Sequence, residues 1–229
     1  IIYYRQLKIK QQTQEIEMSQ TLLRTQMNPH FIFNAMSVIQ GYIYENDPSK
    51  SSKFLVSFSK LIRLILENSP KEFITIETEI DILDKYLKTQ KLRFENRFDF
   101  KISVPDELVF KKVLIPPMIT QPFVENSIEH GQLNIVENGH IHIEFKEQNE
   151  MLYVKIEDNG VGRKESEKRN SKKDHKSMAL NITKERVKIL NKKYRSKATV
   201  EIGDLQEGKY SGTLVELNLP LLTEKINLD

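Results

Sequence analysis

The stretch Gln26-Met27-Asn28-Pro29-His30-Phe31-Ile32-Phe33-Asn34 organises this chain. Continued as a helix, it carries an apolar stripe at helical spacing, made of Ile32, Met36, Ile39 and Ile43. His30 lies on a different stripe of polar or small residues, so its imidazole can face water. Pro29 removes a backbone donor and disfavours helical geometry at Asn28, which predicts a kink or helix break here. Taken alone, the stretch fits an ordinary surface histidine on a bent helix.

The composition limits the classes of function. The 229 residues suffice for one large or two modest domains, and 35 basic residues nearly balance 32 acidic ones, for a net charge of +3. A dedicated nucleic-acid binder usually shows a basic excess, so we expect no direct nucleic-acid binding. The chain has no cysteine, which excludes disulfides and thiolate metal sites.

The first 24 residues predict a helix of their own. Ile1-Ile2-Tyr3-Tyr4-Arg5 is typical of the end of a membrane helix with its basic anchor, although a coiled-coil start has the same pattern. Ile9, Ile16 and Leu23 then recur every seven residues, which indicates a weak coiled-coil seam or a single solvated helix.

A turn at residues 46–49 should join the His30 helix to a second amphipathic helix that stops before Pro70. Its apolar positions are Phe54, Phe58, Leu61, Ile62 and Ile65. An isolated antiparallel hairpin cannot cover the apolar stripes of both helices, whereas dimerisation into a four-helix bundle would. A third helix should begin after the cap residue Thr75, with Glu77 and Glu79 in its first turn, where they favour the helix dipole.

The period changes at Phe98, from which apolar and polar residues alternate as in a strand, so we place a domain boundary at about residue 95. The second region predicts helices at 119–130 and 182–194. It also predicts strands near 141–145, 152–156, 199–202 and 213–219. Mixed helices and an antiparallel-looking sheet predict an α+β chain whose second part is a two-layer α/β sandwich.

Two segments of the second region can carry chemistry. In the predicted helix, Asn126 offers an amide oxygen suited to Mg²⁺, and the neighbouring Glu125 could orient a nucleophile or water. Glu157-Asp158-Asn159-Gly160-Val161-Gly162 ends a strand, where a buried Asp158 could accept a hydrogen bond from an exocyclic amine and the glycines permit close backbone approach. Each segment alone also fits a solvated helix face or a common turn.

Two further segments have weaker signals. Ser177-Met178-Ala179-Leu180-Asn181 should start a helix, whose free backbone donors suit an anion, after the polar run 163–176. Ser211-Gly212-Thr213 precedes the last strand and is by itself only a turn.

Taken in order, Pro-His-Phe-x-Phe-Asn, Pro-Phe-Val-Glu-Asn-x-Ile-x-His-Gly, Asp-Asn-Gly-x-Gly and Gly-Thr before a terminal strand resemble a sensor histidine kinase of the LytS-like class. The resemblance covers residues from about 20 to 221. It implies a helical dimerisation hairpin bearing the phosphoacceptor, followed by a Bergerat (GHKL) ATP-binding fold. The domains would be a juxtamembrane or coiled-coil helix at 1–24, a dimerisation and phosphotransfer region at 25–95, a catalytic domain at 96–222 and a tail at 223–229.

The resemblance also assigns roles. His30 would be phosphorylated from ATP, and Asn34, one turn on, could orient its ring without usefully accepting a proton. Asn126 would hold Mg²⁺ against the phosphates, with Glu125 as a polar or basic helper. Asp158 would bind the adenine amino group.

The rest of the expected nucleotide site is backbone-rich. Gly160 and Gly162 would shape the pocket below the base, and the segment 163–176 would be the ATP lid. Residues expected near the nucleotide are His130, Asn181, Gly212 and Thr213, although His130 equally suits a cap at its helix end.

The chain departs from the pattern of histidine kinases at two positions. Ala179 replaces a glycine at the end of the lid, which would weaken nucleotide binding if that position needs a positive φ. Phe31 follows the histidine where many histidine kinases have an acidic residue, a feature shared by the LytS-like class, so the base that serves His30 is not evident.

The expected partners follow from the resemblance. They are a second copy of the chain and a response regulator, in this class often of the LytTR type. We expect the chain to be the cytoplasmic portion of a bacterial protein anchored in the membrane through a missing N-terminal part. Two alternatives remain open: a catalytically weak nucleotide-binding scaffold, and a gyrase- or Hsp90-like ATPase in which Glu125 activates water.

Overall fold

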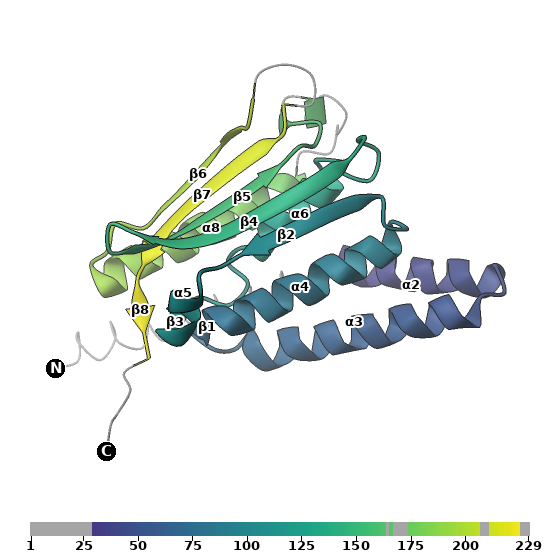
Figure 1. The fold of residues 1–229 in the computed structure, drawn as a ribbon, viewed down its shortest axis with the longest axis horizontal. Coiled ribbons are helices and arrows are strands. Elements are labelled where there is room, and N and C mark those ends of the chain that lie inside the picture. The colour runs from purple at the N-terminus through teal and green to yellow at the C-terminus, as the bar shows by residue number, and fades with distance from the viewer. Residues whose placement is uncertain (1–28, 164, 167–173, 207–210, 225–229) are drawn as a thin grey trace, which may run out of the picture. The chain divides into compact units, whose positions relative to one another are not determined.

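The computed structural model describes residues 29–163, 165–166, 174–206 and 211–224 (Figure 1). The chain divides into two compact units, residues 1–71 and 72–229. The expected juxtamembrane helix and its heptad seam lie outside the described residues, as does most of the expected lid. Within the described part of the chain, no helix combines the length and the apolar character needed to cross a membrane.

The first unit contains the predicted antiparallel helical hairpin, which the structure confirms (Figure 1). Helix α2 spans Pro29–Tyr44 and α3 spans Pro48–Asn68. The turn holds because the Asp47 side chain caps α3 and accepts a hydrogen bond from the Lys50 N–H at 2.9 Å. Aromatic rings fill the seam between the two helices, with the Phe31 and Phe58 centroids 5.5 Å apart.

The hairpin seam uses residues of α2 that lie outside the apolar stripe described from the sequence. Phe31 and Ala35 are buried, whereas Met36 and Ile43 are 48% and 60% exposed. The prediction for α3 was closer, because Phe54, Phe58, Leu61 and Ile65 are buried. The apolar stripe predicted on α2 therefore stays largely uncovered within one chain.

The second unit has a five-stranded sheet in the order β2-β4-β5-β7-β6. The strands are β2 (Phe98–Ser103), β4 (Gly139–Gln148), β5 (Met151–Asp158), β6 (Thr199–Asp204) and β7 (Thr213–Pro220). Only the β2–β4 pair among these neighbours is parallel. Helices α4 (Ile76–Arg93), α6 (Gln121–Glu129) and α8 (Asp174–Tyr194) complete the second layer (Figure 1). The α+β class and the two-layer sandwich are thus confirmed.

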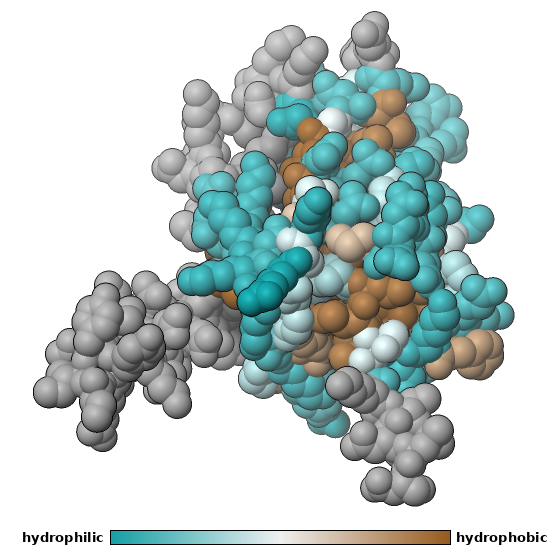
Figure 2. Space-filling view, turned by 90° about the vertical axis from the view of Figure 1, so that its left-hand side faces the viewer, coloured by the Kyte–Doolittle hydropathy of each residue, from teal (hydrophilic) through white to brown (hydrophobic). Residues whose placement is uncertain are grey.

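The sheet buries one face because its strands alternate in register. Ile143 lies opposite Ile156, which lies opposite Val215, and all three are buried. Figure 2 shows polar residues over most of one side of the molecule, with apolar residues gathered in smaller patches between them.

Several short elements were not predicted. Helix α5 spans Asp106–Phe110, and a second sheet joins β1 (Ile74–Thr75), β3 (Val113–Ile115) and β8 (Leu222–Thr223) in the order β1-β3-β8. Strands of two or three residues are too short to show an alternating pattern. Thr223, at which the sequence placed the start of a tail, pairs with Val113 in this sheet.

The compact units divide between Lys71 and Glu72, whereas the sequence placed a boundary near residue 95. Helix α4 lies in the second unit because it buries a full apolar face there, including Leu83, Tyr86 and Leu87. The change of period at Phe98 marks the passage from a helix to a strand. The assignment of functions to 25–95 and 96–222 stays a prediction.

Candidate functional site

Three of the sequence motifs meet in the second unit through their backbones. The Val161 N–H donates to the Gly131 carbonyl at 2.9 Å, and the Gly212 N–H donates to the Gly160 carbonyl at 3.1 Å. The end of the α6 motif, the loop after β5 and the turn before β7 are therefore joined at one place. Segments about 30 and 50 residues apart in the chain thus form one site.

The glycines are required by this junction. A Cβ on Gly160 would lie 2.4 Å from the Gly131 carbonyl oxygen, and one on Gly212 would lie 2.1 Å from the Asp158 carbonyl oxygen. Gly212 also has a φ of +62°, which favours glycine. The sequence prediction attributed the glycines of the β5 loop to the approach of a ligand. In the structure, the atoms nearest to a Cβ on Gly160 are the carbonyl oxygen and Cα of Gly131 and the side-chain Oδ1 of Asp158.

Asp158 lies at the end of β5, inside this junction, and is fully buried. Its Oδ1 accepts a hydrogen bond from the Gly160 N–H at 2.9 Å. Its Oδ2 is buried and has no hydrogen-bond partner in the described part of the chain. A buried acceptor left unpaired is costly, and a ligand amine is one group that would satisfy it.

The electrostatics of Asp158 agree with that geometry. Burial raises the pKa of its carboxyl, and the neighbouring Ser127, Gly160 and Thr213 oppose part of that rise. Thr213 lies opposite Asp158 across the β5–β7 ladder. The predicted residues Asp158, Gly160, Gly212 and Thr213 are therefore brought together, and Ser127 joins them from α6.

Helix α6 carries the second expected group of residues. Glu125 and Asn126 are both partly exposed on it. The Asn126 carbonyl accepts the N–H groups of His130 and Gly131, each at 2.9 Å. His130 is the C-cap residue of α6, which fits the alternative that it caps the helix end.

The third motif differs from its prediction. Helix α8 begins at Asp174, so residues 177–181 lie inside the helix instead of at its start. The expected anion site on free backbone donors at Ser177 is therefore wrong, because those N–H groups belong to the helical ladder. Nothing in the polar run before Ser177 marked where the helix begins. Asn181 is exposed on α8, and the side chain of Ala179 lies outside the described residues.

The expected phosphoacceptor belongs to the first unit. His30 lies in the first turn of α2, and its side chain lies outside the described residues. Asn34 is partly exposed one turn further along α2.

Sequence reasoning missed several residues of α4 that contact the elements leading to α6. Glu79 is fully buried and accepts hydrogen bonds from the Met118 N–H at 2.7 Å and from the Thr120 hydroxyl at 2.6 Å. At the other end of α4, Arg93 Nη1 donates to the Glu129 carboxylate. Sequence reasoning assigned Glu79 only a favourable interaction with the helix dipole, and it assigned Arg93 no role.

The donor set fits a nucleotide better than a metal held by protein alone. Among the described residues, no group of three or more His, Asp or Glu side chains could hold a metal ion. A Mg²⁺ ion at Asn126 would therefore need oxygens from a bound phosphate and from water, which is how Mg²⁺ is commonly held beside nucleotides.

Comparisons with known proteins support the resemblance seen in the sequence. The histidine kinase family profile matches residues 18–98. The BtsS sensor histidine kinase of Escherichia coli K12 is 36% identical over 138 residues, 60% of this chain and 24% of that protein. The LytS sensor protein of Staphylococcus epidermidis is 34% identical over 140 residues, 61% of this chain and 23% of that protein. The LytS sensor protein of Enterococcus faecalis is 28% identical over 212 residues, 90% of this chain and 34% of that protein.

A solved histidine kinase domain from Erythrobacter litoralis superposes loosely, with a TM-score of 0.47 at 15% identity over 90% of this chain and 96% of that chain. The sequence matches, the hairpin with His30 in its first turn and the α/β unit with its convergent motifs agree with a resemblance to histidine kinases. Within that class, the matched relatives support a LytS-like sensor histidine kinase. It spans about a quarter of the length of the first two relatives.

Proposed function

We propose that this chain is the catalytic region of a sensor histidine kinase. It binds ATP with Mg²⁺, transfers the γ-phosphoryl group to His30 and passes it to an aspartate of a response regulator. The observation that carries the nucleotide part is the buried Oδ2 of Asp158, which lacks a partner among the described residues where three motifs meet. The resemblance to the LytS-like family supports the phosphotransfer part.

The base of the nucleotide is assigned to Asp158. Adenine carries an exocyclic amine that can donate to Oδ2, while Oδ1 keeps its bond from Gly160. Thr213 lies opposite Asp158 in the sheet, and Gly212 directly precedes Thr213 in the chain. Gly162 follows Asp158 by four residues in the chain. A guanine would place a carbonyl at the same point of the ring and could not donate there, so Asp158 selects adenine.

The phosphate end is assigned to α6 and α8. The Asn126 amide oxygen would be the protein's ligand to Mg²⁺, and Glu125 would orient polar groups beside it. Asn181 on α8 and His130 at the end of α6 are further candidates for phosphate contact. Bound Mg²⁺ supplies positive charge that offsets the charge developing on the phosphate oxygens.

The transfer itself needs little from the nucleophile. An unperturbed imidazole is mostly neutral at cytoplasmic pH. A ring nitrogen of His30 forms a bond to the γ-phosphorus as the bond to the ADP oxygen breaks, and the ring proton passes to solvent. Asn34, one helical turn on, can orient the ring without taking that proton.

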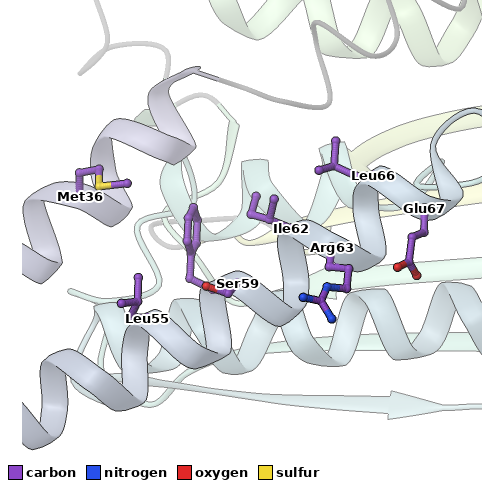
Figure 3. Close-up of a pocket in the computed structure, with 8 residues that line it drawn as sticks. Met36, Leu55, Ser59, Ile62, Arg63, Leu66 and Glu67 are labelled. Carbon is purple, nitrogen blue, oxygen red and sulfur yellow. The ribbon is translucent and has the colours of Figure 1, made fainter.

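The hairpin is proposed to form a homodimer. Met36 and Leu55 line one apolar pocket between α2 and α3, together with Phe58, Ile62 and Leu66 (Figure 3). Phe33 on α2 is 70% exposed, and Val56 on α3 is 52% exposed. A second copy that packs its own hairpin here, as a four-helix bundle, would bury these side chains.

The remaining assignments rest on the family. The response regulator would be of the LytTR type, and the chain would be the cytoplasmic portion of a bacterial protein anchored in the membrane by a part outside this sequence. No direct contact with nucleic acid is proposed.

One labelling experiment tests the proposal against its two alternatives. The chain is incubated with γ-labelled ATP and Mg²⁺ beside His30→Gln and Glu125→Ala, and the labelled protein is treated with acid and with alkali. The kinase predicts label that acid removes and alkali spares, and that is absent from His30→Gln although this variant still binds ATP. Label persisting on His30→Gln would overturn the assignment.

The alternatives have their own signatures in the same samples. A non-catalytic scaffold binds ATP and acquires no label. A gyrase- or Hsp90-like ATPase releases phosphate steadily, keeps this activity in His30→Gln and loses it in Glu125→Ala.

A further inference from the structure

Glu79 lies in the first turn of α4, yet its side chain is fully buried. It accepts hydrogen bonds from the Met118 N–H at 2.7 Å, the Thr120 hydroxyl at 2.6 Å and the Thr120 N–H at 3.4 Å. All these donors belong to the three residues that precede α6. A carboxylate so placed costs desolvation, and these bonds offset that cost.

Arg186 of α8 reaches the same segment from the other side. It donates to the Pro117 carbonyl at 2.9 Å, and its guanidinium lies near enough to Glu79 for the two charges to interact. Burial is the larger effect on both groups: it raises the pKa of Glu79 and lowers the pKa of Arg186 to about 10. Residues 117–120 are therefore held between a side chain of α4 and a side chain of α8.

The conformation of this segment needs such support. Met118 has a φ of +53°, a region that residues with side chains seldom adopt. Thr120 is the N-cap residue of α6, but within the described residues no side-chain cap bond forms there. Its hydroxyl donates to Glu79 instead of serving its own helix. The direction in which α6 starts is thus set by a side chain of another helix.

Helix α4 also holds the other end of α6. Arg93 Nη1 contacts the Glu129 carboxylate and donates to Gln90 Oε1 at 3.3 Å. Between the two ends, Tyr86 is buried, and the nearby charges of Glu125 and Glu129 add to burial in raising the pKa of its hydroxyl. Helix α6 has only nine residues, so fixing both ends fixes the residues between them.

We propose that Glu79 is a positioning residue for the phosphate side of the nucleotide site: its carboxylate fixes residues 117–120 and, through them, the helix that carries Asn126. This inference rests on the proposed nucleotide binding and deepens it. The base end of the site is built differently. Asp158 is held by its own strand and by Gly160, and among the described residues neither forms a hydrogen bond with Glu79.

The test separates the two ends of the nucleotide. Binding of adenosine and of a non-hydrolysable ATP analogue with Mg²⁺ is measured by titration calorimetry for the unaltered chain and for Glu79→Gln. The glutamine amide keeps one acceptor oxygen. In place of the other carboxylate oxygen it has an NH₂ group, which cannot accept the hydrogen bond that this oxygen accepted. We expect the affinity for the Mg²⁺–analogue to fall about ten- to hundredfold, the size of effect that a small misplacement produces, and the affinity for adenosine to stay unchanged.

Two further variants guard against a purely structural effect. Leu219→Ala removes a buried side chain near the end of β7 remote from Thr213 and should lower the melting temperature without separating the two ligands. Thr120→Val removes only the hydroxyl donor and should selectively weaken binding of the Mg²⁺–analogue. Thr120→Ser keeps the hydroxyl donor and should keep the affinity of the unaltered chain.

The outcomes are distinct. If Glu79→Gln lowers the affinity for both ligands equally, or for neither, the inference is overturned. The proposed nucleotide binding of the unaltered chain would still stand. Failure of the unaltered chain to bind either ligand would overturn the proposed function, and the inference with it.

Discussion

Replacing Asp158 by asparagine should reverse the base preference of the nucleotide site. Asp158 Oδ1 keeps a role that an amide oxygen can fill, because it only accepts from Gly160 at 2.9 Å. Oδ2, which has no partner among the described residues, becomes an N–H₂ group in Asp158→Asn. The variant then presents a donor where the original presents an acceptor.

The magnitude follows from this one atom pair. A hydrogen bond to a charged group contributes about 1.5–3 kcal/mol, so its loss should weaken ATP binding about 10- to 150-fold. Inosine triphosphate has a carbonyl in place of the amine. It should bind poorly to the unaltered chain and gain affinity in Asp158→Asn, because the new amide can donate to that carbonyl.

The same variant has a predicted effect on stability. Burial raises the folded-state pKa of Asp158 above its unfolded value, so the folded state binds this proton more tightly than the unfolded state does. That contribution to the free energy of unfolding is fully present below the unfolded pKa and is lost as pH rises through the raised pKa. Asparagine has no carboxyl proton, so the free energy of unfolding of Asp158→Asn does not fall in this way as pH rises. Without nucleotide, its stability relative to the unaltered chain should therefore increase from acid to neutral pH.

Titration calorimetry with both nucleotides and urea unfolding at several pH values measure these effects. Only the difference between the two proteins is interpreted, because other groups titrate in both. If Asp158→Asn binds ATP as tightly as the unaltered chain, the carboxylate does not contact the base and the assignment of the site fails.

Three further perturbations test the fold and the proposed dimer. Gly160→Ala should destabilise the chain by about 1–3 kcal/mol or prevent folding, since its Cβ would lie 2.4 Å from a carbonyl oxygen, whereas Gly203→Ala has no atom within 4 Å and should unfold like the original in urea. Asp47→Ala should lower the temperature at which helical circular dichroism is lost, because it removes the cap of α3, and Asp47→Asn should recover most of that loss. Met36→Lys should shift sedimentation from dimer towards monomer, and an unchanged dimer would contradict packing on this face.

The elements that the sequence predicted well are those in which the pattern of apolar and polar residues repeats over many residues. Strands β4, β5 and β7 alternate over eight or more residues and pack one face, so their existence follows from the pattern. The hairpin followed from the turn signal at residues 46–49 and from the apolar stripe of α3. Four motifs in a fixed order carried the family, which no single motif could have done.

The failures have physical causes. Glu79 is buried because donors 39 and 41 residues away meet it, a long-range compensation that no local pattern shows. The side chains of α2 that pack on α3 begin with Phe31. Helix α2 has two apolar stripes, so the sequence alone does not decide which of them packs on α3. The start of α8 lies among polar residues that suit a loop and a helix equally. The glycines near Asp158 indicated that other atoms lie close to the backbone there, but they did not indicate which atoms these are.

The site itself was predicted in part. Asp158, Gly160, Gly212 and Thr213 were expected in one place and do lie together. Their role in nucleotide binding stays a prediction, as do the roles of His30, Glu125 and Asn126. The contacts that hold α6 were absent from the prediction, which gave Glu79 only an interaction with the helix dipole and gave Arg93 no role.

The location of the phosphate tests the central claim most directly. After incubation with ATP and Mg²⁺, the chain is digested without acid exposure and its peptides are sequenced by mass spectrometry, with Asp158→Asn as a parallel sample. We predict one phosphoryl group on the peptide that contains His30, and markedly less of it in Asp158→Asn at limiting ATP. Phosphate on any other residue, or none on a chain that binds ATP and forms its dimer, would contradict the account.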